Sequence, residues 1–286
     1  IGYQTLSNNT SGYDNTAVGN DALLSNTTGA ENVAVGKQSL DANTTGVKNV
    51  AVGKYSLSGN TTGGSNTAVG DQALFTQTGA DHNTAIGRSV LYANTTGTKQ
   101  VAIGNYALYD NTTGNNNTAL GYGTLANNTT ASNNTAIGYE ALTQNTTATN
   151  NTSVGAYGLD HNTTGASNTA VGAEALTANT TGDANTSMGK DSMQGNTTGD
   201  YNTAVGKDAL QYNTTASENT AVGYQALKVN TTGTRCVAVG AYALDANTDA
   251  VNNTAIGWAA MTNCTTGVDN TAVGREAAQY ITTGYH

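Results

Sequence analysis

Large apolar side chains are scarce in this chain of 286 residues. Proline is absent, phenylalanine and tryptophan occur once each, and leucine, isoleucine, valine and phenylalanine together make up about 15% of the residues. A chain below roughly 20% usually lacks the apolar material for a packed core, so composition alone would predict disorder. Two observations oppose that prediction. Charged residues make up only 10% of the chain, and the few large apolar residues recur at fixed positions of a repeat.

Basic residues and long apolar runs are lacking as well. The net charge is −9 at pH 7, and without a basic patch to neutralise phosphates we expect no nucleic-acid binding. No run of about twenty apolar residues is present, so we expect no membrane insertion. No signal peptide is visible either. Because the chain opens on Ile1 in the middle of a repeat, we expect it to be a segment of a longer protein.

A repeat with a fixed period runs through the whole chain. Copies begin with Asn-Thr-Ala-Val-Gly or a close variant, at Asn15 and then at every seventeenth residue to Asn270. The sequence predicts a single repeat array over residues 1–286, with a truncated copy at 1–14 and sixteen full repeats at 15–286. A fixed period this short indicates that each copy is one structural unit stacked on its neighbours.

Two positions carry large aliphatic side chains when the repeat is numbered 1 to 17 from this motif. Position 4 is always Val, Ile, Leu or Met, and position 9 is Leu or Met until Ala278 in the last copy. Position 2 is Thr or Val and shares a strand face with position 4, so we expect it to be half-buried there. The core predicted from positions 4 and 9 begins with Val18, Leu23, Val35, Leu40, Val52 and Leu57.

Position 3 stays small throughout the chain. It is alanine in nearly every copy, beginning with Ala17, Ala34 and Ala51, and serine at Ser153 and Ser187. A solvated face would tolerate larger polar residues, so this smallness indicates that another surface presses against the position. That surface is either the opposite wall of a flattened coil or another chain, in which case these alanines make a lateral contact.

Glycine at position 5 and asparagine at position 12 predict turns. Position 5 is glycine in every copy, as in Gly19 and Gly36, which fits a bend that needs positive φ or a close backbone approach. Position 12 is asparagine in most copies, as in Asn26 and Asn43, and Asn-Thr-Thr-Gly is typical turn chemistry. Repeated in register, these asparagine side chains can also bond one another as a ladder.

The economical fold class is all-β, a parallel β-solenoid or β-roll of about 16 to 17 coils, each formed by one repeat. Helices are the poorer alternative, because Gly, Thr and Asn are weak helix formers and the period does not follow from an amphipathic helical pattern. Positions 6–7, 10–11 and 16–17 vary without order. We expect these variable positions at the solvent-facing edges of the coil.

The strand motif resembles that of a known family. Asn-Val-Ala-Val-Gly at 32–36 and Asn-Thr-Ala-Ile-Gly at 134–138 resemble the YadA-like head repeats of trimeric autotransporter adhesins, and the whole unit is similar to NTAVG repeats of phage tail-fibre proteins. The resemblance covers nearly the full chain. It implies a left-handed β-roll assembled as a homotrimer and located extracellularly, at the cell surface or on a phage virion. A trimer would also supply the surface that position 3 requires.

A repeat places like residues in columns, whereas an active site needs unlike residues that converge. We therefore expect no enzyme activity, no catalytic residue, no cofactor and no metal, and no calcium-binding nonapeptide is present. Cys236 replaces the asparagine of position 1, and Cys264 replaces that of position 12 one copy later. They are either two buried thiols in place of ladder asparagines or, if the two columns meet, a disulfide.

One aromatic edge is predicted. Phe75, Tyr92 and Tyr109 occupy position 10 in three successive copies. We expect their rings to stack along one edge, where they either stabilise the coils or hold a sugar ring.

The function predicted first is that of a structural fibre or filament protein, extracellular or virion-borne, whose partner is itself, as a trimer or an end-to-end filament. The alternative is an adhesin or tail-fibre module that recognises cell-surface glycans. A minor alternative is ice binding by regular threonine arrays. Against it, the threonines at positions 13 and 14 are adjacent, and the exchange of Thr for Val at position 2 indicates burial.

Overall fold

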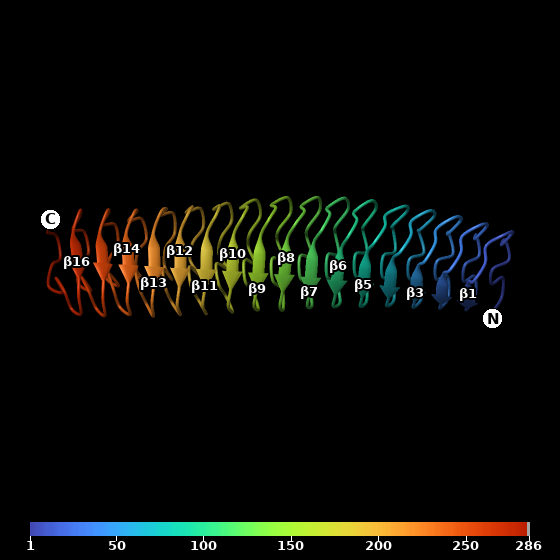
Figure 1. Ribbon diagram of the computed structural model, residues 1–286, viewed down its shortest axis with the longest axis horizontal. Coiled ribbons are helices and arrows are strands. Elements are labelled where there is room, and N and C mark those ends of the chain that lie inside the picture. Colours follow the sequence, from blue (N-terminus) through green and yellow to red (C-terminus); the bar gives the residue numbers. More distant parts are fainter. Residues whose placement is uncertain (285–286) are drawn as a thin grey trace. The chain divides into compact units, whose positions relative to one another are not determined.

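The computed structural model describes residues 1–284 and shows an all-β parallel solenoid, which confirms the predicted fold class (Figure 1). One three-residue strand forms in each full repeat, at positions 2 to 4. The strands are β1 Thr16–Val18, β2 Val33–Val35, β3 Val50–Val52, β4 Thr67–Val69, β5 Thr84–Ile86, β6 Val101–Ile103, β7 Thr118–Leu120, β8 Thr135–Ile137, β9 Thr152–Val154, β10 Thr169–Val171, β11 Thr186–Met188, β12 Thr203–Val205, β13 Thr220–Val222, β14 Val237–Val239, β15 Thr254–Ile256 and β16 Thr271–Val273.

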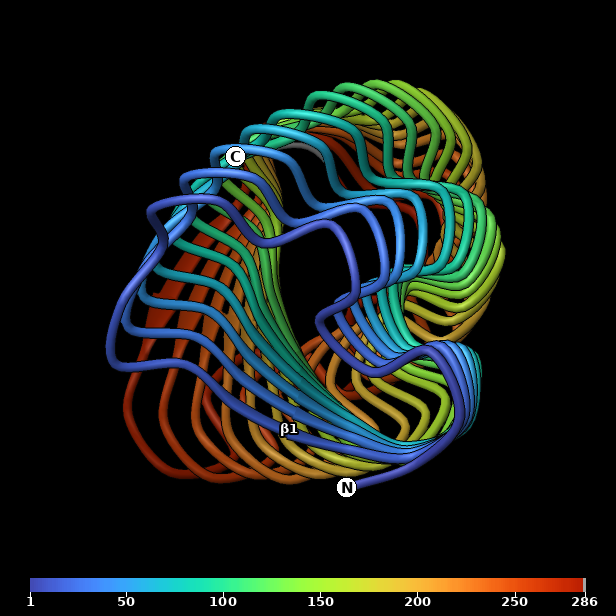
Figure 2. The ribbon, with the colours of Figure 1, turned by 90° about the vertical axis from the view of Figure 1, so that its right-hand side faces the viewer.

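The coils group into two compact units, one over Ile1–Thr147 with β1 to β8 and one from Ala148 onward with β9 to β16. Within each unit neighbouring strands pair in parallel at equivalent positions, so that Ala34 of β2 pairs with Ala51 of β3. Figure 2 shows β1 on one straight side of its coil, with turns completing the circuit. The described part of the chain contains no helix, and so none that is long and apolar enough to cross a membrane.

Hydrogen bonds between coils continue beyond the short strands. In the strand, Val33 N–H donates to Asn49 O of the next coil at 2.8 Å. In the turns, Leu40 N–H donates to Ser56 O at 3.0 Å, and Thr44 N–H donates to Thr61 O at 2.8 Å. The backbone is thus satisfied by the neighbouring coils around much of the circumference, as a stacked repeat requires.

The leucines of position 9 form the core, as the sequence predicts. Leu23, Leu40 and Leu57 are fully buried. Alanine or serine at position 8 is buried beside them, as at Ala22 and Ser39. The asparagines of positions 1 and 12 are buried too, so the interior is partly polar.

The assignment of position 4 to the core is wrong. Val18 is 39% exposed, and Val35 and Val52 are half-buried on the outside of the coil. Neighbouring side chains of a strand point to opposite faces, and it is position 3 that points inward. The space inside so short a coil is already occupied by position 9 and two asparagine columns, which leaves room on the strand side only for a small residue.

Ala17, Ala34 and Ala51 therefore lie inside their own coils, with at most 9% of their surface exposed. Their prediction as a lateral contact with another chain is wrong. The other interpretation, in which position 3 faces the opposite wall of the coil, is confirmed. Positions 2 and 4 do share a face, but that face points outward.

The glycines of position 5 form the turn that the sequence predicts. Gly19 and Gly36 have φ of 136° and 137°, a region that glycine alone enters without strain. A Cβ atom on Gly36 would also lie 2.4 Å from the carbonyl oxygen of Gly53 in the next coil, so position 5 combines positive φ with a close backbone approach.

The asparagine ladder of position 12 is present. Asn43 Nδ2 donates to Asn26 Oδ1 of the preceding coil at 2.8 Å, and also to Gly46 O of its own turn at 3.1 Å. The position 1 asparagines form a second ladder, in which Asn49 N–H donates to Asn32 Oδ1 at 3.0 Å. Each asparagine thus ties its turn to a neighbouring coil by side-chain bonds.

Left-handed backbone at three non-glycine positions was not anticipated. Positions 7, 9 and 17 have positive φ in nearly every coil, as in Gln38 (53°), Leu40 (53°) and Lys48 (60°). This conformation costs roughly 1–2 kcal/mol for a residue with a Cβ atom. The hydrogen bonds that these N–H groups make to neighbouring coils offset that cost.

Candidate interaction surface

Positions 2 and 4 of the strands form an outward surface in each unit, here named the strand face. Position 4 contributes a continuous aliphatic column, and among its members Ile86 is 38%, Ile137 39% and Met188 43% exposed. Position 2 contributes a parallel column of threonine with valine at four coils. Neither column contains a charged residue. An uninterrupted apolar stripe of this kind is characteristic of a contact surface.

The register of the sheet makes the strand face regular. Within each unit position 2 pairs with position 2, as in Val50 with Thr67, and position 4 pairs with position 4, as in Val69 with Ile86 and Val171 with Met188, at the same height of consecutive coils. With strands about 4.8 Å apart and about 3.3 Å of rise per residue, the eight strands of one unit present roughly 400 Å². That area is comparable to the apolar patches of a few hundred Å² that mark interaction sites.

The predicted aromatic edge is confirmed. Phe75 and Tyr92 stack with ring centroids 5.2 Å apart and planes at 11°, and Tyr92 and Tyr109 stack at 5.2 Å and 12°. Because the rings lie face to face, they cover the faces on which a sugar ring would pack. The geometry therefore supports the stabilising role of this edge and not glycan binding.

The stack is longer than the sequence indicated. Seven rings form a series in which each contacts the next, and we call this series the first aromatic row. Its members are Tyr55, Phe75, Tyr92, Tyr109, Tyr106, Tyr122 and Tyr139. The additional tyrosines lie at positions 6 and 7, which pack beside position 10 at the same edge. Position 10 alone does not reveal them, but tyrosine at position 6 of two successive copies, Tyr122 and Tyr139, is a visible signal in the sequence.

A second aromatic row lies in the later unit. Tyr224 and Tyr242 meet edge to face at 5.3 Å and 89°, and Tyr242 meets Trp258 at 6.4 Å and 84°. Lys207 Nζ lies 5.7 Å from the Tyr224 ring centroid, and Arg275 Cζ lies 5.1 Å from that of Trp258. Such cation–π contacts at exposed sites stabilise the edge by about 0.5–1 kcal/mol each.

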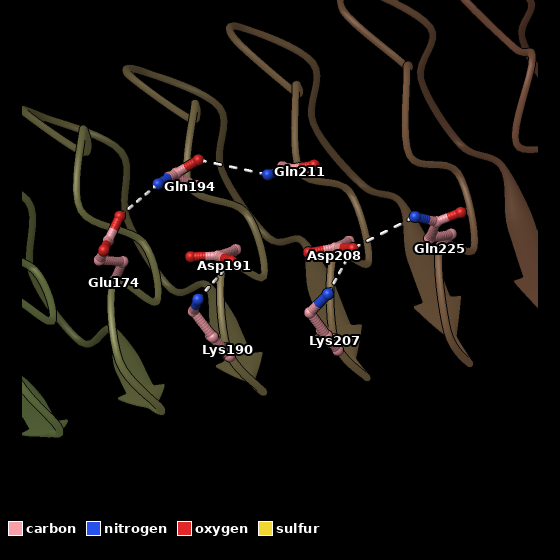
Figure 3. Close-up of polar contacts among 8 residues, drawn as sticks. All are labelled: Glu174, Lys190, Asp191, Gln194, Lys207, Asp208, Gln211 and Gln225. Carbon is pink, nitrogen blue, oxygen red and sulfur yellow. Dashed lines mark hydrogen bonds and ion pairs between the residues drawn. The ribbon is translucent and has the colours of Figure 1, made fainter.

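A row of polar side chains occupies the variable positions of coils in the later unit (Figure 3). Its members are Glu174, Lys190, Asp191, Gln194, Lys207, Asp208, Gln211 and Gln225. Gln194 Nε2 donates to Glu174 Oε2 at 2.7 Å. Asp208 pairs with Lys207 at 3.4 Å and accepts a hydrogen bond from Gln225 Nε2 at 3.2 Å. Since every carboxylate here has a partner, the row links consecutive coils and offers no open site.

The remaining titratable groups of the described residues form no reactive constellation. Burial raises the pKa of Asp41 and of Asp245, against the lowering effect of hydrogen bonds from Ser58 Oγ and Thr262 Oγ1. Among residues 1–284, no three His, Cys, Asp or Glu side chains lie close enough to hold a metal ion, and no pocket opens.

Both cysteines are free and buried. Cys236 Sγ donates to Ala250 O at 3.3 Å, and Cys264 Sγ lies 3.8 Å from Gly267 O. Both carbonyls belong to position 15. In other coils the asparagine side chains of positions 1 and 12 donate hydrogen bonds to the carbonyl of position 15, as Asn32 and Asn43 do to Gly46 O. The two thiols thus replace ladder asparagines, which confirms one of the two interpretations from the sequence. Burial raises the pKa of Cys236 to about 11.

Comparison with protein-family models and with curated proteins finds no match for this chain. The resemblance to adhesin head repeats and tail-fibre repeats therefore stays a prediction. The strand face, the aromatic rows and the internal ladders are the features from which a function can be argued.

Proposed function

We propose that this protein is a structural fibre protein that associates laterally with further copies of itself through the strand face. The observation that carries the proposal is the uninterrupted aliphatic column of position 4, which lies on the outside of the coil and contains no charged residue. Its location outside the cell or on a virion rests on the resemblance of the strand motif alone.

The chemistry of the strand face supports association with a second sheet. Two sheets pack face to face at about 10 Å when apolar side chains interdigitate between them. Position 4 provides such side chains at every coil, and position 2 adds threonine methyl groups and valines. The variable edges, which carry the charges of this acidic chain, would remain in solvent at the rim, as in known interfaces.

Charged substitutions on the strand face test the proposal. The triple variant Val35→Lys/Val69→Lys/Ile103→Lys places three cations on position 4 of alternate coils. Burying unpaired charge is strongly unfavourable, so we expect sedimentation velocity to show a single chain for this variant and a multimer for the unchanged protein.

A matched control variant distinguishes an effect of the strand face from an effect of the added positive charge. Thr28→Lys/Thr62→Lys/Thr96→Lys adds the same three cations at exposed residues of position 14, and we expect it to sediment as the multimer. If both variants dissociate equally, net charge and not the strand face governs assembly. Circular dichroism confirms that each variant keeps its fold.

Ice binding is a second candidate, because the threonines of position 2 point outward. One of the two sequence-based reasons against it was the burial indicated by Thr-to-Val exchange at position 2, and Thr67 and Thr84 are half-buried on the outward face instead of inside the coil. A flat column of threonines in register beside an aliphatic column is a surface that could order water. Two results together would favour ice binding over lateral assembly. The unchanged protein would sediment as a single chain, and it would show thermal hysteresis that the strand-face triple variant abolishes.

A further inference from the structure

Two tyrosine pairs in the first aromatic row lie face to face. Tyr122 and Tyr139 have ring centroids 5.5 Å apart and planes at 8°, and Tyr92 and Tyr109 are 5.2 Å apart at 12°. The members of each pair occupy the same position of successive repeats, so each pair spans two consecutive coils. Tyr122 and Tyr139 are also each 46% exposed, which gives a soluble oxidant access to both phenols.

We propose that Tyr122 and Tyr139 are a site of oxidative cross-linking, at which a dityrosine bond joins two consecutive coils of the first unit. The oxidant is a haem peroxidase using hydrogen peroxide. Each phenol loses one electron and one proton and becomes a phenoxyl radical. The two radicals form a carbon–carbon bond between ring carbons ortho to oxygen, and the hydrogens on those carbons move to the oxygens. One peroxide accepts the two electrons and two protons and becomes two waters.

The geometry favours coupling within this pair over random encounters. Backbone pairing of β7 with β8 holds the two coils in register, so the radicals meet without diffusion, and such proximity greatly raises an effective concentration. The two rings are nearly parallel, at 8°, with centroids 5.5 Å apart. Tyr224 and Tyr242 provide the internal comparison, because they are equally close at 5.3 Å but perpendicular at 89°.

The row also supplies a relay for the radical. Tyr106 lies 5.9 Å from Tyr122 and 5.8 Å from Tyr109, measured between ring centroids. A hole created on the exposed Tyr122 can therefore pass to the half-buried pair of Tyr109 and Tyr92. The inference does not depend on lateral assembly, since both rings of each pair belong to the same chain.

Limited treatment with horseradish peroxidase and hydrogen peroxide, at low protein concentration, tests the proposal. We expect dityrosine fluorescence and, after thermolysin digestion, a linked peptide pair containing Tyr122 and Tyr139 that is lighter by two hydrogens. Tyr139→Phe should remove this species, whereas Tyr224→Phe should leave its yield unchanged. The proposal is overturned if linkage involves only the most exposed tyrosines such as Tyr3 and Tyr280, if Tyr224–Tyr242 linkage equals it, or if no linked peptide forms.

Discussion

At the scale of single residues, two interruptions of the position 12 ladder leave polar atoms without partners. The ladder passes from Asn60 to Gln77 and from Asn247 to Cys264, and the Oδ1 atoms of Asn60 and Asn247 are buried with no hydrogen-bond partner. Gln77 Nε2 donates to Ala80 O at 2.8 Å instead, and Cys264 has no amide to donate. The orphaned acceptors thus follow directly from the two substitutions in the repeat.

Restoring the ladder should stabilise the protein. Gln77→Asn and Cys264→Asn each supply the missing amide donor, and since an unsatisfied buried acceptor costs about 1–3 kcal/mol, each variant should raise the free energy of unfolding by an amount of that order. Guanidinium unfolding followed by circular dichroism measures it. Gln144→Asn, the same exchange outside the ladder, serves as control. Ladder variants that unfold at the unchanged midpoint would contradict this account.

Position 5 and position 15 make different demands on glycine. Gly36 has φ of 137°, whereas Gly46 at position 15 lies outside the positive-φ region, and Ala131 and Ala216 occupy its equivalent in other coils. Gly36→Ala should therefore destabilise the protein by several kcal/mol, roughly the sum of backbone strain and overpacking. Gly46→Ala should cost less, because a Cβ atom there would crowd Gly63 O at 2.4 Å but would add no backbone strain. Equal losses in thermal unfolding would show that positive φ is not what fixes glycine at position 5.

The Cys236 thiol makes the free energy of unfolding depend on pH in the alkaline range. Burial raises its folded pKa from 9.0 to about 11, so the folded state favours the neutral thiol. This contribution is fully present below about pH 9 and is lost as pH rises towards 11, in total roughly 3 kcal/mol. The difference in unfolding free energy between the unchanged protein and Cys236→Ser should shrink over that range. A difference that stays constant would mean that the thiol is not buried.

Single residues could be predicted from the sequence where one property dominates. Gly36, Asn43 and Leu40 were assigned correctly because invariant glycine, turn-forming asparagine and an apolar column each have few structural explanations. The positive φ of Leu40 was not predicted, because leucine has no intrinsic preference for that conformation. Only the closing of a short coil, with its bonds to the next coil, imposes it.

At the scale of the coil, inward-facing and outward-facing side chains contribute differently to the free energy of unfolding. Leu57 is fully buried, whereas Val52 is half-buried on the strand face. Leu57→Ala should lower the free energy of unfolding by about 2–5 kcal/mol, because it leaves a cavity, and Val52→Ala should cost less than about 1 kcal/mol. Denaturant unfolding of both variants checks this. A larger loss of unfolding free energy for Val52→Ala would indicate that position 4 belongs to the core after all.

The direction of the strand could not be decided from its pattern. Alternation along Val33–Val35 defines two faces but not which one is inside. Size favoured valine for the interior, and that inference failed because the interior was already filled from the other side of the coil. The information needed was the width of the coil, which depends on the turns and is not visible in a three-residue motif.

At the scale of the whole molecule, the uninterrupted period of the repeat was sufficient to predict a parallel all-β solenoid. A register without insertions allows each coil to pair with the next, and the strand pairing from Thr16–Val33 onward follows it. The oligomeric state was argued from Ala34, which lies inside its own coil. The feature that favours association is instead the aliphatic column of the strand face.

The mass of the unchanged protein in solution tests the central claim most directly. Static light scattering during size-exclusion chromatography, over a range of protein concentrations, gives that mass without reference to shape. An outward-facing aliphatic column, half-buried or exposed at each strand, predicts a multiple of the single-chain mass of 28.9 kDa. A mass of one chain at every concentration would contradict lateral association through the strand face.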